Sequence, residues 1–398
     1  MHKTFQQLNT FLLKHQALWR LDPFRQSMQP QWFPEFIPSD MARWLTQLEI
    51  EEIEQLKGSP ELIIEELGHH IPELRTIHDL AMLSEIHLPS AERNLRLENG
   101  IPGRKLAQIQ SLGQSVLNAH HGSEWLEWCS GKGYLGRILA FHSQQPVVSF
   151  EYQQSLCDSG QFEADHLSLP MTFIQGDAFD GESQRNFHRD QHAVALHACG
   201  DLHVKLMQYA AQAQCCAVSF SPCCYHLIES DTYQAQSQLG QDSGLLLTKD
   251  ELRIPLQETV TGGDRVKRHR QLEMSFRLGL DALLRNELRH NSYCSIPSIK
   301  KSKLSDGFSA FCFWAAEHKG FQLCNVNFDY YEKIGQQRFW QMERLSLVQQ
   351  PFRRLLEMWL VLDKAMYLQQ QGYRVELSEF CSRAMTPRNI LIHAVRVG

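Results

Sequence analysis

The chain has 398 residues, of which 43% are hydrophobic and 21% charged, so its composition excludes a disordered or fibrous protein. At about 150 residues per domain, this length predicts two or three domains, or one large domain with insertions. The formal net charge of −6 excludes a globally basic nucleic-acid binder but is compatible with a local basic patch.

The sequence shows no signal for a membrane or for secretion. No apolar run approaches the roughly 18–20 residues that a transmembrane helix needs. The first residues lack the apolar segment and the cleavage site of a signal peptide. In that context we interpret the eleven cysteines as reduced thiols and not as a disulfide framework. We therefore expect a cytoplasmic protein without membrane contact.

Residues 1–115 are predicted to form an N-terminal helical region. Phe5, Leu8 and Leu12 recur at helical spacing. Ser39 or Asp40 is expected to cap a helix that continues to Gly58, and a further helix is expected to follow from Ser59.

Residues 116–230 are predicted to form a parallel sheet. Short apolar runs alternate there with helical segments, which is typical of strands joined by right-handed helical crossovers. The continuous apolar character of these runs fits a sheet buried on both faces. The five predicted strands are 125–129, 147–151, 171–175, 193–196 and 216–220.

The rest of the chain is predicted as a helical insertion, residues 231–350, and a C-terminal part, residues 351–398, that completes the sheet. The C-terminal part contains a helix over 355–371 and two strand-like runs, 373–377 and 389–395. The insertion carries two basic clusters that we expect to contact the phosphates of RNA. They consist of Arg265, Lys267, Arg268 and Arg270, after the glycines at 262 and 263, and of Lys300, Lys301 and Lys303.

The strongest motif is a glycine turn between the first strand and the next helix. Its residues are Glu127, Cys129, Ser130, Gly131, Lys132 and Gly133, followed by Gly136. Glycine lets the backbone take positive φ and approach a ligand closely. The helix that follows offers free N–H groups to a polar or anionic group. The spacing also fits Gly-x-Gly-x-x-Gly, so the pattern alone leaves a dinucleotide open.

Two later strands also end in acidic residues. Glu151 ends the second strand and can accept hydrogen bonds from both hydroxyls of a ribose. Asp177 follows the third strand, next to Ala178, and can accept from an adenine amino group. Together with Glu127, these acids should surround one crevice at the carboxyl edge of the sheet. A carboxylate at Glu127 would repel a pyrophosphate but can pair with an amino group.

This pattern resembles the class I S-adenosylmethionine-dependent methyltransferases. Three motifs look like one branch of that superfamily: residues 129–133, residues 197–202 and residues 221–226. The branch contains the methyltransferase-like proteins also called ribosomal RNA adenine dimethylase domain-containing proteins, and the tRNA acceptor-stem 2′-O-methyltransferases. The resemblance covers about residues 95–230 and 300–398. Residues 1–100 lack the zinc modules that precede the catalytic domain of the tRNA enzymes.

The resemblance implies an α/β fold with the Rossmann-like seven-stranded sheet of class I methyltransferases, S-adenosylmethionine as cofactor, and RNA, either tRNA or rRNA, as substrate. The cofactor-binding residues that we predict from the motifs and from the resemblance are Glu127, Cys129, Ser130, Gly131, Lys132, Gly133, Glu151, Asp177, Ala178 and His197.

Several cysteines and histidines follow the fourth and fifth strands, and we weighed a metal site there. A zinc site needs ligands that converge tetrahedrally, often from a Cys-x-x-Cys knuckle, and none is present. Adjacent cysteines in an extended segment point to opposite faces, so Cys223 and Cys224 should not share a metal. We therefore predict no metal and interpret these residues as packing against cofactor and substrate.

Catalytic candidates follow the same two strands. Methyl transfer depends mainly on positioning, and a hydroxyl acceptor also needs a base. His197 is the first candidate base, with Asp201 as its orienting partner or as the base itself, although His197 could also bond only to its own loop. Tyr225 and His226 are second candidates. Cys223 offers another chemistry, covalent attack during pyrimidine C5 methylation.

Two other functions remain open at this point. The net charge of −6 and the absence of a recognised RNA-binding module favour a protein or small-molecule methyltransferase. A protein that binds the cofactor without catalysis is also conceivable, and the intact glycine turn argues against it.

Overall fold

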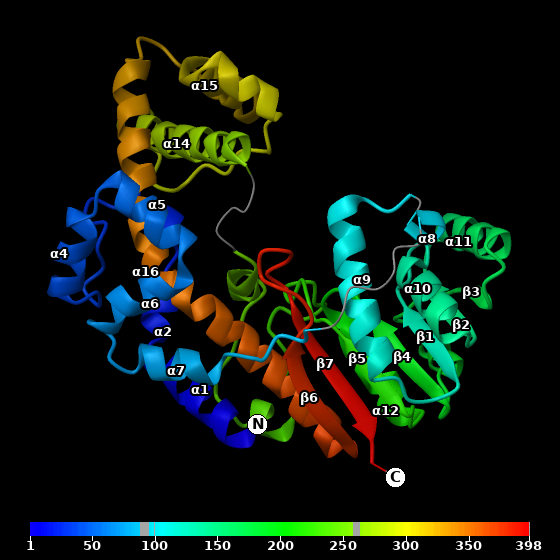
Figure 1. The fold of residues 1–398 in the computed structure, drawn as a ribbon. Coiled ribbons are helices and arrows are strands. Elements are labelled where there is room, and N and C mark those ends of the chain that lie inside the picture. Colours follow the sequence, from blue (N-terminus) through cyan, green and yellow to red (C-terminus); the bar gives the residue numbers. More distant parts are fainter. Residues whose placement is uncertain (88–94, 99, 258–262, 398) are drawn as a thin grey trace. The chain divides into compact units, whose positions relative to one another are not determined.

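The computed structural model describes residues 1–87, 95–98, 100–257 and 263–397, so Gly262 of the predicted basic insertion lies outside the described residues. Its centre is a seven-stranded sheet in the order β3-β2-β1-β4-β5-β7-β6 (Figure 1). The strands are β1 Glu124–Trp128, β2 Val147–Glu151, β3 Met171–Gln175, β4 Gln191–Ala195, β5 Ala217–Phe220, β6 Tyr373–Glu379 and β7 Ile390–Arg396. The predicted seven-stranded α/β sheet is confirmed.

The sheet is parallel from β3 to β5 and becomes antiparallel at β7. Strands β1, β2, β3, β4 and β5 pair in parallel, whereas β7 runs antiparallel to both β5 and β6. Because β1 lies between β2 and β4, the order of the strands reverses on either side of it. Such a switch point is where open α/β sheets bind ligands, at the carboxyl ends of the strands.

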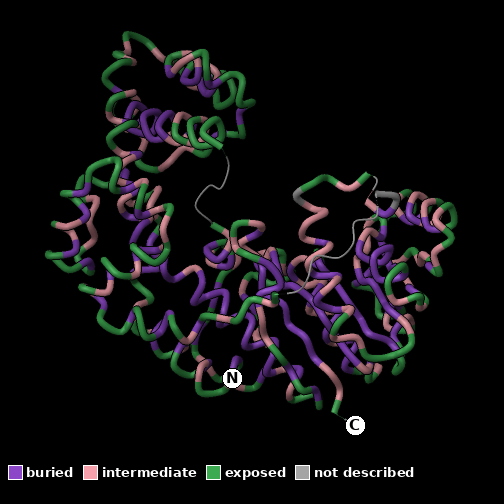
Figure 2. The backbone as a smooth tube through the Cα atoms, viewed as in Figure 1, coloured by how far each residue is buried: buried purple, intermediate pink, exposed green. Residues whose placement is uncertain are grey.

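The strands are short and apolar because helices cover the sheet. Every residue of β4 is buried, and β1 is buried at all positions after Glu124. Figure 2 shows the sheet as a predominantly buried region of the backbone. Three helices pack on these strands: α10 Tyr134–Ser143 on β1 and β2, α11 Gln154–His166 on β2 and β3, and α12 Asp201–Gln212 on β4 and β5.

The chain forms two compact units, each assembled from non-consecutive stretches. The first consists of Met1–Leu13, Asp79–Gln257 and Arg354–Gly398 and contains the sheet. The second consists of Lys14–His78 and Glu258–Arg353. The four segments predicted from the sequence, with boundaries at 115, 230 and 350, stay a prediction.

The helical character predicted for residues 1–115 is present. The described helices there are α1 His2–Lys14, α2 Gln16–Trp19, α3 Pro23–Gln26, α4 Ser39–Gln47, α5 Ile50–Gly58, α6 Pro60–Gly68, α7 Leu74–Leu80, α8 Leu95–Glu98 and α9 Gly103–Asn118. The single helix expected up to Gly58 is wrong, because Leu48 is extended and Glu49 starts α5 with a capping box to Glu52.

The remaining segments are also helical. They are η1 Gly181–Asn186, α13 Gln238–Gln241, η2 Glu251–Leu256, α14 Asp264–Glu287, η3 Lys301–Asp306, α15 Phe308–Lys319 and α16 Phe328–Gln370. In the second unit, α14, α15 and the start of α16 share an apolar core that includes Phe276, Phe308 and Phe311. The helical character predicted for the insertion is therefore present. No helix in the described parts of the chain combines the length and the apolar character that crossing a membrane requires.

Candidate active site

The glycine turn after β1 is built from residues at positive φ. Cys129, Gly131 and Gly133 have φ of 56°, 59° and 68°. A Cβ at Gly133 would lie 2.4 Å from the ring of Phe173, whereas a Cβ at Gly131 would meet nothing within 4 Å. Gly133 precedes the first residue of α10, so the turn allows β1 and α10 to pack closely.

Glu151 at the end of β2 is joined to this turn. Its Oε2 accepts a hydrogen bond from the backbone N–H of Gly131 at 2.9 Å, and its Oε1 accepts from the N–H of Gln153 at 3.0 Å. At the next strand end, the Asp177 Oδ1 accepts from the N–H of Phe179 at 2.9 Å. Both carboxylates are therefore fixed by backbone donors at the carboxyl edge of the sheet.

Glu151 and Asp177 line the same cavity, which has a volume of about 330 Å³. Its lining residues are Cys129, Phe150, Glu151, Tyr152, Gly176, Asp177, Ala178, Phe179 and Leu202. Four of them are among the predicted cofactor residues: Cys129, Glu151, Asp177 and Ala178. The volume lies in the usual range for small-molecule sites, and the walls combine apolar surface with a few polar groups, as such sites do.

Glu127 is placed elsewhere. It is 4% exposed, its Oε2 accepts from the Ser149 hydroxyl at 2.9 Å, and backbone N–H groups at the start of α10 also bond to it. Burial raises the pKa of the Glu127 carboxyl to about 7. The described residues that line the cavity do not include Glu127. It holds the first turn of α10 against β1, and the predicted contact with an amino group stays a prediction.

Among the described residues, the lining of the cavity also does not include the other predicted residues of the turn, Ser130, Gly131, Lys132 and Gly133. Lys132 is exposed and uses its carbonyl to accept from Arg137 at 3.4 Å. The Ser130 N–H donates to the Phe150 carbonyl at 3.0 Å, and the buried Ser130 hydroxyl has no hydrogen-bond partner among the described residues. Sequence spacing identified the turn correctly but could not separate its cavity-facing residues from its framework.

The cavity also contains residues that the sequence analysis did not select. Tyr152 and Phe179 directly follow Glu151 and Ala178, and their side chains are 65% and 53% exposed. An aromatic residue close to a strand-end acid is the sequence signal that could have identified them, because aromatic side chains commonly line small-molecule sites.

The loops after β4 and β5 are hydrogen-bonded to each other. The Gly200 N–H donates to the Cys223 carbonyl at 3.1 Å, and the Asp201 N–H donates to the Leu227 carbonyl at 3.0 Å. The Asp201 Oδ2 accepts from the N–H of Glu229 at 2.7 Å. The structure therefore brings together the loops that carry all five predicted catalytic residues.

His197 reaches solvent from the first of these loops. Although part of its imidazole is exposed, the surrounding protein atoms, together with Lys105 and Arg388, lower the pKa of His197 to about 4. The ring is therefore neutral at physiological pH and offers a lone pair. Lys105 of α9 and Arg388 are charged neighbours of this candidate base.

The remaining candidates differ in accessibility. Tyr225 is 2% exposed, and burial raises the pKa of its phenol well above the usual value, so its hydroxyl stays protonated. That hydroxyl and the His226 Nδ1 are buried without a hydrogen-bond partner in the described part of the chain. Burial lowers the pKa of His226. Of the two, only His226 is partly exposed.

Three thiols converge at the two loops. The sulfurs of Cys199, Cys223 and Cys224 all lie within 4.8 Å of one another. The expectation that Cys223 and Cys224 point to opposite faces is wrong, because Cys224 takes a φ of 47° and leaves the extended conformation. A hydrogen bond from Cys223 lowers the pKa of Cys224 to about 5, whereas the Cys199 hydrogen bond raises that of Cys223. The proposed covalent role of Cys223 stays a prediction.

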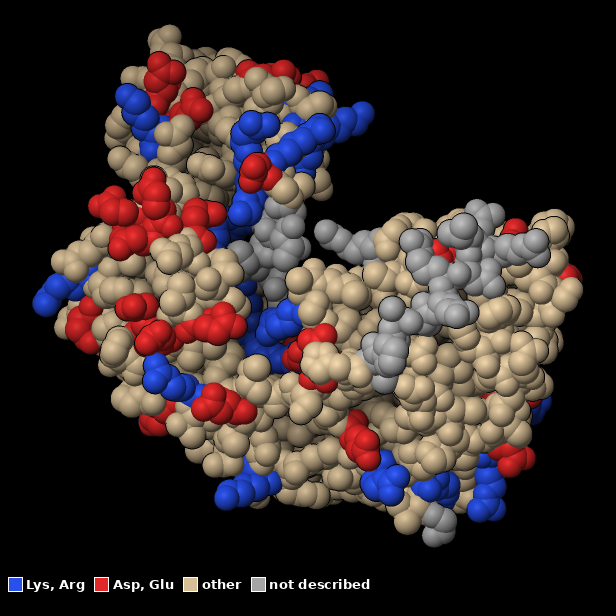
Figure 3. Space-filling model, in the orientation of Figure 1, with Lys and Arg blue, Asp and Glu red and all other residues tan. Residues whose placement is uncertain are grey.

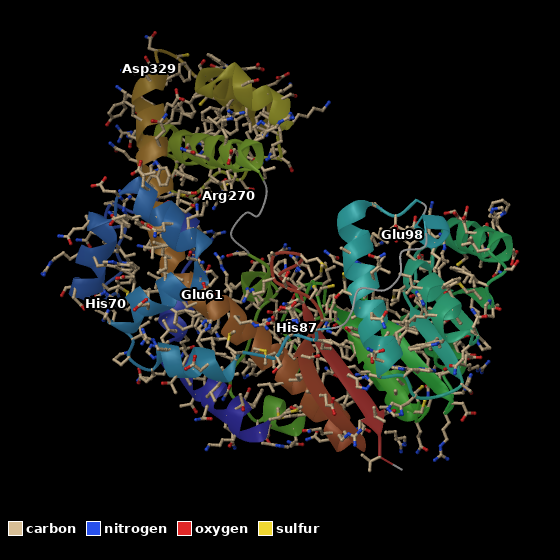
Figure 4. All side chains as sticks on the ribbon, in the orientation of Figure 1. Glu61, His70, His87, Glu98, Arg270 and Asp329 are labelled. Atoms are coloured by element: carbon tan, nitrogen blue, oxygen red, sulfur yellow. The ribbon has the colours of Figure 1, made fainter. Side chains whose placement is uncertain are left out.

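The predicted basic residues lie in the second unit, on α14 and around η3. Arg265, Lys267 and Arg268 are exposed, and Figure 3 shows Lys and Arg side chains gathered where α14 begins. Arg270, labelled in Figure 4, forms an ion pair with Glu343 at 2.8 Å. Lys301 pairs with Glu273. Arg265, Lys267 and Arg268 at the start of α14 are therefore available to a ligand, and so are the exposed Lys300 and Lys303 of the second cluster.

Comparisons with known proteins agree with a small-molecule site at the carboxyl edge of the sheet. Residues 104–231 match the family model described as a methyltransferase domain. No curated protein matches the sequence. The match covers the glycine turn, both cavity carboxylates and the loops after β4 and β5. The sheet topology and the cavity at its carboxyl edge agree with a methyltransferase domain over residues 104–231.

Solved structures resemble parts of this chain only weakly. One is the tRNA (uracil-54, C5)-methyltransferase of Pyrococcus abyssi in complex with S-adenosyl-L-homocysteine, at 17% identity and a TM-score of 0.25, covering 29% of this chain and 28% of that one. Another is a putative sarcosine dimethylglycine methyltransferase from Galdieria sulphuraria, at 11% identity and a TM-score of 0.27, covering 33% and 51%. The chain thus spans about half or less of these proteins, and neither likeness supports a conclusion about substrate.

Proposed function

We propose that this protein is an S-adenosylmethionine-dependent methyltransferase that acts on RNA, either tRNA or rRNA, in the cytoplasm. The observation that carries the choice of RNA is the group of exposed basic side chains at the start of α14, because phosphate contacts dominate the affinity of proteins for nucleic acids. The motif resemblance to the branch with ribosomal RNA adenine dimethylase domain-containing proteins and tRNA acceptor-stem 2′-O-methyltransferases supports the same substrate.

The cavity fits the cofactor in its donor set. Glu151 and Asp177 both line it: the Glu151 carboxylate would accept hydrogen bonds from ribose hydroxyls, and the Asp177 carboxylate would accept from an adenine amino group. Tyr152 and Phe179 supply flat apolar surface for the base. When bound, S-adenosylmethionine would supply an electrophilic methyl group carried on a sulfonium.

The chain's own contribution to the reaction is positioning and proton transfer. His197, which is neutral at physiological pH, would accept a proton from a hydroxyl acceptor, while Asp201 braces the neighbouring loop through Glu229. With an amino acceptor, the same loops would hold the nitrogen lone pair toward the methyl group.

The first experiment tests cofactor binding at the two strand-end acids. Asp177→Ala and Glu151→Gln should each weaken S-adenosylmethionine binding about tenfold, or about 1.4 kcal/mol, measured by isothermal titration calorimetry. Glu163→Gln on α11, which removes the same charge away from the cavity, should bind like the unaltered protein. Unchanged affinity in both site variants would refute the assignment.

A second experiment identifies the acceptor. The protein is incubated with methyl-labelled S-adenosylmethionine and an extract of cells that lack it, and label is measured in RNA, protein and small molecules. Label in RNA that disappears with Glu151→Gln supports the proposal. Label in protein or small molecules would replace RNA as the substrate. Cofactor binding with no label in any fraction, from an extract known to retain unmethylated acceptors, would indicate a non-catalytic binding protein.

A further inference from the structure

A cluster of three thiols occupies the ends of β4 and β5, next to the cofactor cavity. The sulfurs of Cys199 and Cys223 lie 3.3 Å apart, and Cys224 brings a third sulfur within 4.8 Å of both. Cys129, which lines the cavity, lies close enough to Cys199 for their charges to interact. Neither cofactor binding nor the proton transfer by His197 uses this cluster.

The spacing of the sulfurs matches a tetrahedral metal site. Zinc binds cysteine sulfur at about 2.3 Å, so two sulfurs on one tetrahedral zinc ion are about 3.8 Å apart. The observed separations, 3.3 Å for one pair and at most 4.8 Å for the others, bracket that value. Small rotations of the side chains would therefore bring all three sulfurs to one ion.

The backbone holds the thiols in this arrangement. Cys199 and Cys223 are paired by a parallel β-bridge, and the Leu227 N–H donates to the Cys224 carbonyl at 2.9 Å. Gly200 takes a φ of 57°, and a Cβ there would lie 1.9 Å from the Leu227 carbonyl oxygen. Cys224 itself has a φ of 47°, a conformation that is unfavourable for a non-glycine residue. Strain of this kind concentrates at functional sites.

We propose that Cys199, Cys223 and Cys224 bind one zinc ion, with the fourth coordination position open to water. Thiolate sulfur selects soft or borderline metals such as zinc over magnesium or calcium. Three thiolates leave an excess negative charge on a zinc site, and the nearby Arg388 guanidinium offsets part of it through its interaction with Cys224. A three-ligand site with an open position is the arrangement that catalytic zinc sites use.

The test is metal binding by the full chain, purified under anaerobic, reducing conditions. After removal of metal with a chelator, the protein is titrated with zinc sulfate, and bound metal is measured by elemental analysis. We expect one zinc per chain. Cys199→Ser and Cys224→Ser should weaken binding by at least the roughly 100-fold that loss of an outer-shell partner can cost. Cys324→Ser, which changes an exposed thiol of the second unit, should bind one zinc with unchanged affinity.

Cobalt titration of the unaltered protein gives a readout that does not depend on variants folding. Co²⁺ in a three-thiolate tetrahedral site should give strong thiolate-to-metal charge-transfer absorption together with visible d–d bands. Absence of these bands and of stoichiometric zinc would overturn the proposal. So would a disulfide between Cys199 and Cys223, found by mass spectrometry, in protein that takes up no metal after reduction. The readout is independent of methyl transfer, so its outcome does not depend on the proposed RNA substrate.

Discussion

Two glycines of the same turn differ in how much space they leave for a side chain. Gly131 and Gly133 have nearly the same backbone conformation, with φ of 59° and 68°. They differ in what surrounds them: a Cβ at Gly133 would meet the Phe173 ring at 2.4 Å, and a Cβ at Gly131 would meet open space. The conformational cost of a side chain is therefore similar at both positions, and the steric cost is not.

We predict that Gly133→Ala lowers the thermal midpoint of the cofactor-free protein more than Gly131→Ala does. Both variants place alanine at positive φ, which costs roughly 1–2 kcal/mol, and only the first adds a clash within the packed turn. Differential scanning calorimetry of both variants checks this. Equal midpoints would mean that Phe173 moves aside without cost.

At the scale of elements, β4, β5 and β7 are linked by a buried polar chain. The Ser219 hydroxyl of β5 lies 2.8 Å from the His192 Nε2 of β4 and 2.7 Å from the His393 Nδ1 of β7. Burial lowers the pKa of His393 to about 4 and that of His192 well below its usual value. The sheet is therefore most stable with both rings neutral.

This hydrogen-bonded chain of His192, Ser219 and His393 predicts that the free energy of unfolding decreases in acid. Between pH 6.5 and about 4, the unfolded chain protonates His393 and the folded chain does not, so stability falls as the pH is lowered through this range. The contribution of His393 should reach about 3 kcal/mol. His393→Asn, which keeps a hydrogen-bonding group, should make the free energy of unfolding in urea less dependent on pH. A parallel pH profile for the variant would contradict the assignment.

The sequence predicted the elements of the core better than it predicted side-chain roles. Glu151 and Asp177 could be placed at strand ends because short apolar runs alternate with helical segments, and each run marks one strand. The roles of Glu127 and Cys224 could not be predicted in the same way. The role of Glu127 depends on where the first turn of α10 packs. The direction of the Cys224 side chain depends on a positive φ, which a sequence pattern does not show.

At the scale of the whole molecule, the proposed RNA contacts belong to a different unit from the cofactor cavity. The acidic net charge of −6 and the exposed basic start of α14 are compatible, because binding depends on local and not total charge. RNA affinity should therefore be separable from cofactor affinity by mutation.

We predict that replacing Arg265, Lys267 and Arg268 with alanine weakens RNA binding and leaves S-adenosylmethionine binding unchanged. Each lost phosphate contact should reduce the slope of log affinity against log salt by about 0.7–0.9. Fluorescence anisotropy with labelled tRNA at several salt concentrations measures this. Lys3→Ala, which removes an exposed charge from the other unit, should not change the slope. An unaltered slope in the triple variant would exclude these residues as phosphate contacts.

The order of the strands also has a consequence for how the protein is made. β7 pairs with β5 on one side and β6 on the other, yet it follows both in the sequence, after the whole second unit. While the ribosome is still synthesising that unit, β5 has an unpaired edge that could pair with another nascent chain. The sheet is completed only when β7 emerges and inserts between its two neighbours, so a nascent chain stalled before residue 390 should be prone to aggregation and a candidate for chaperone binding.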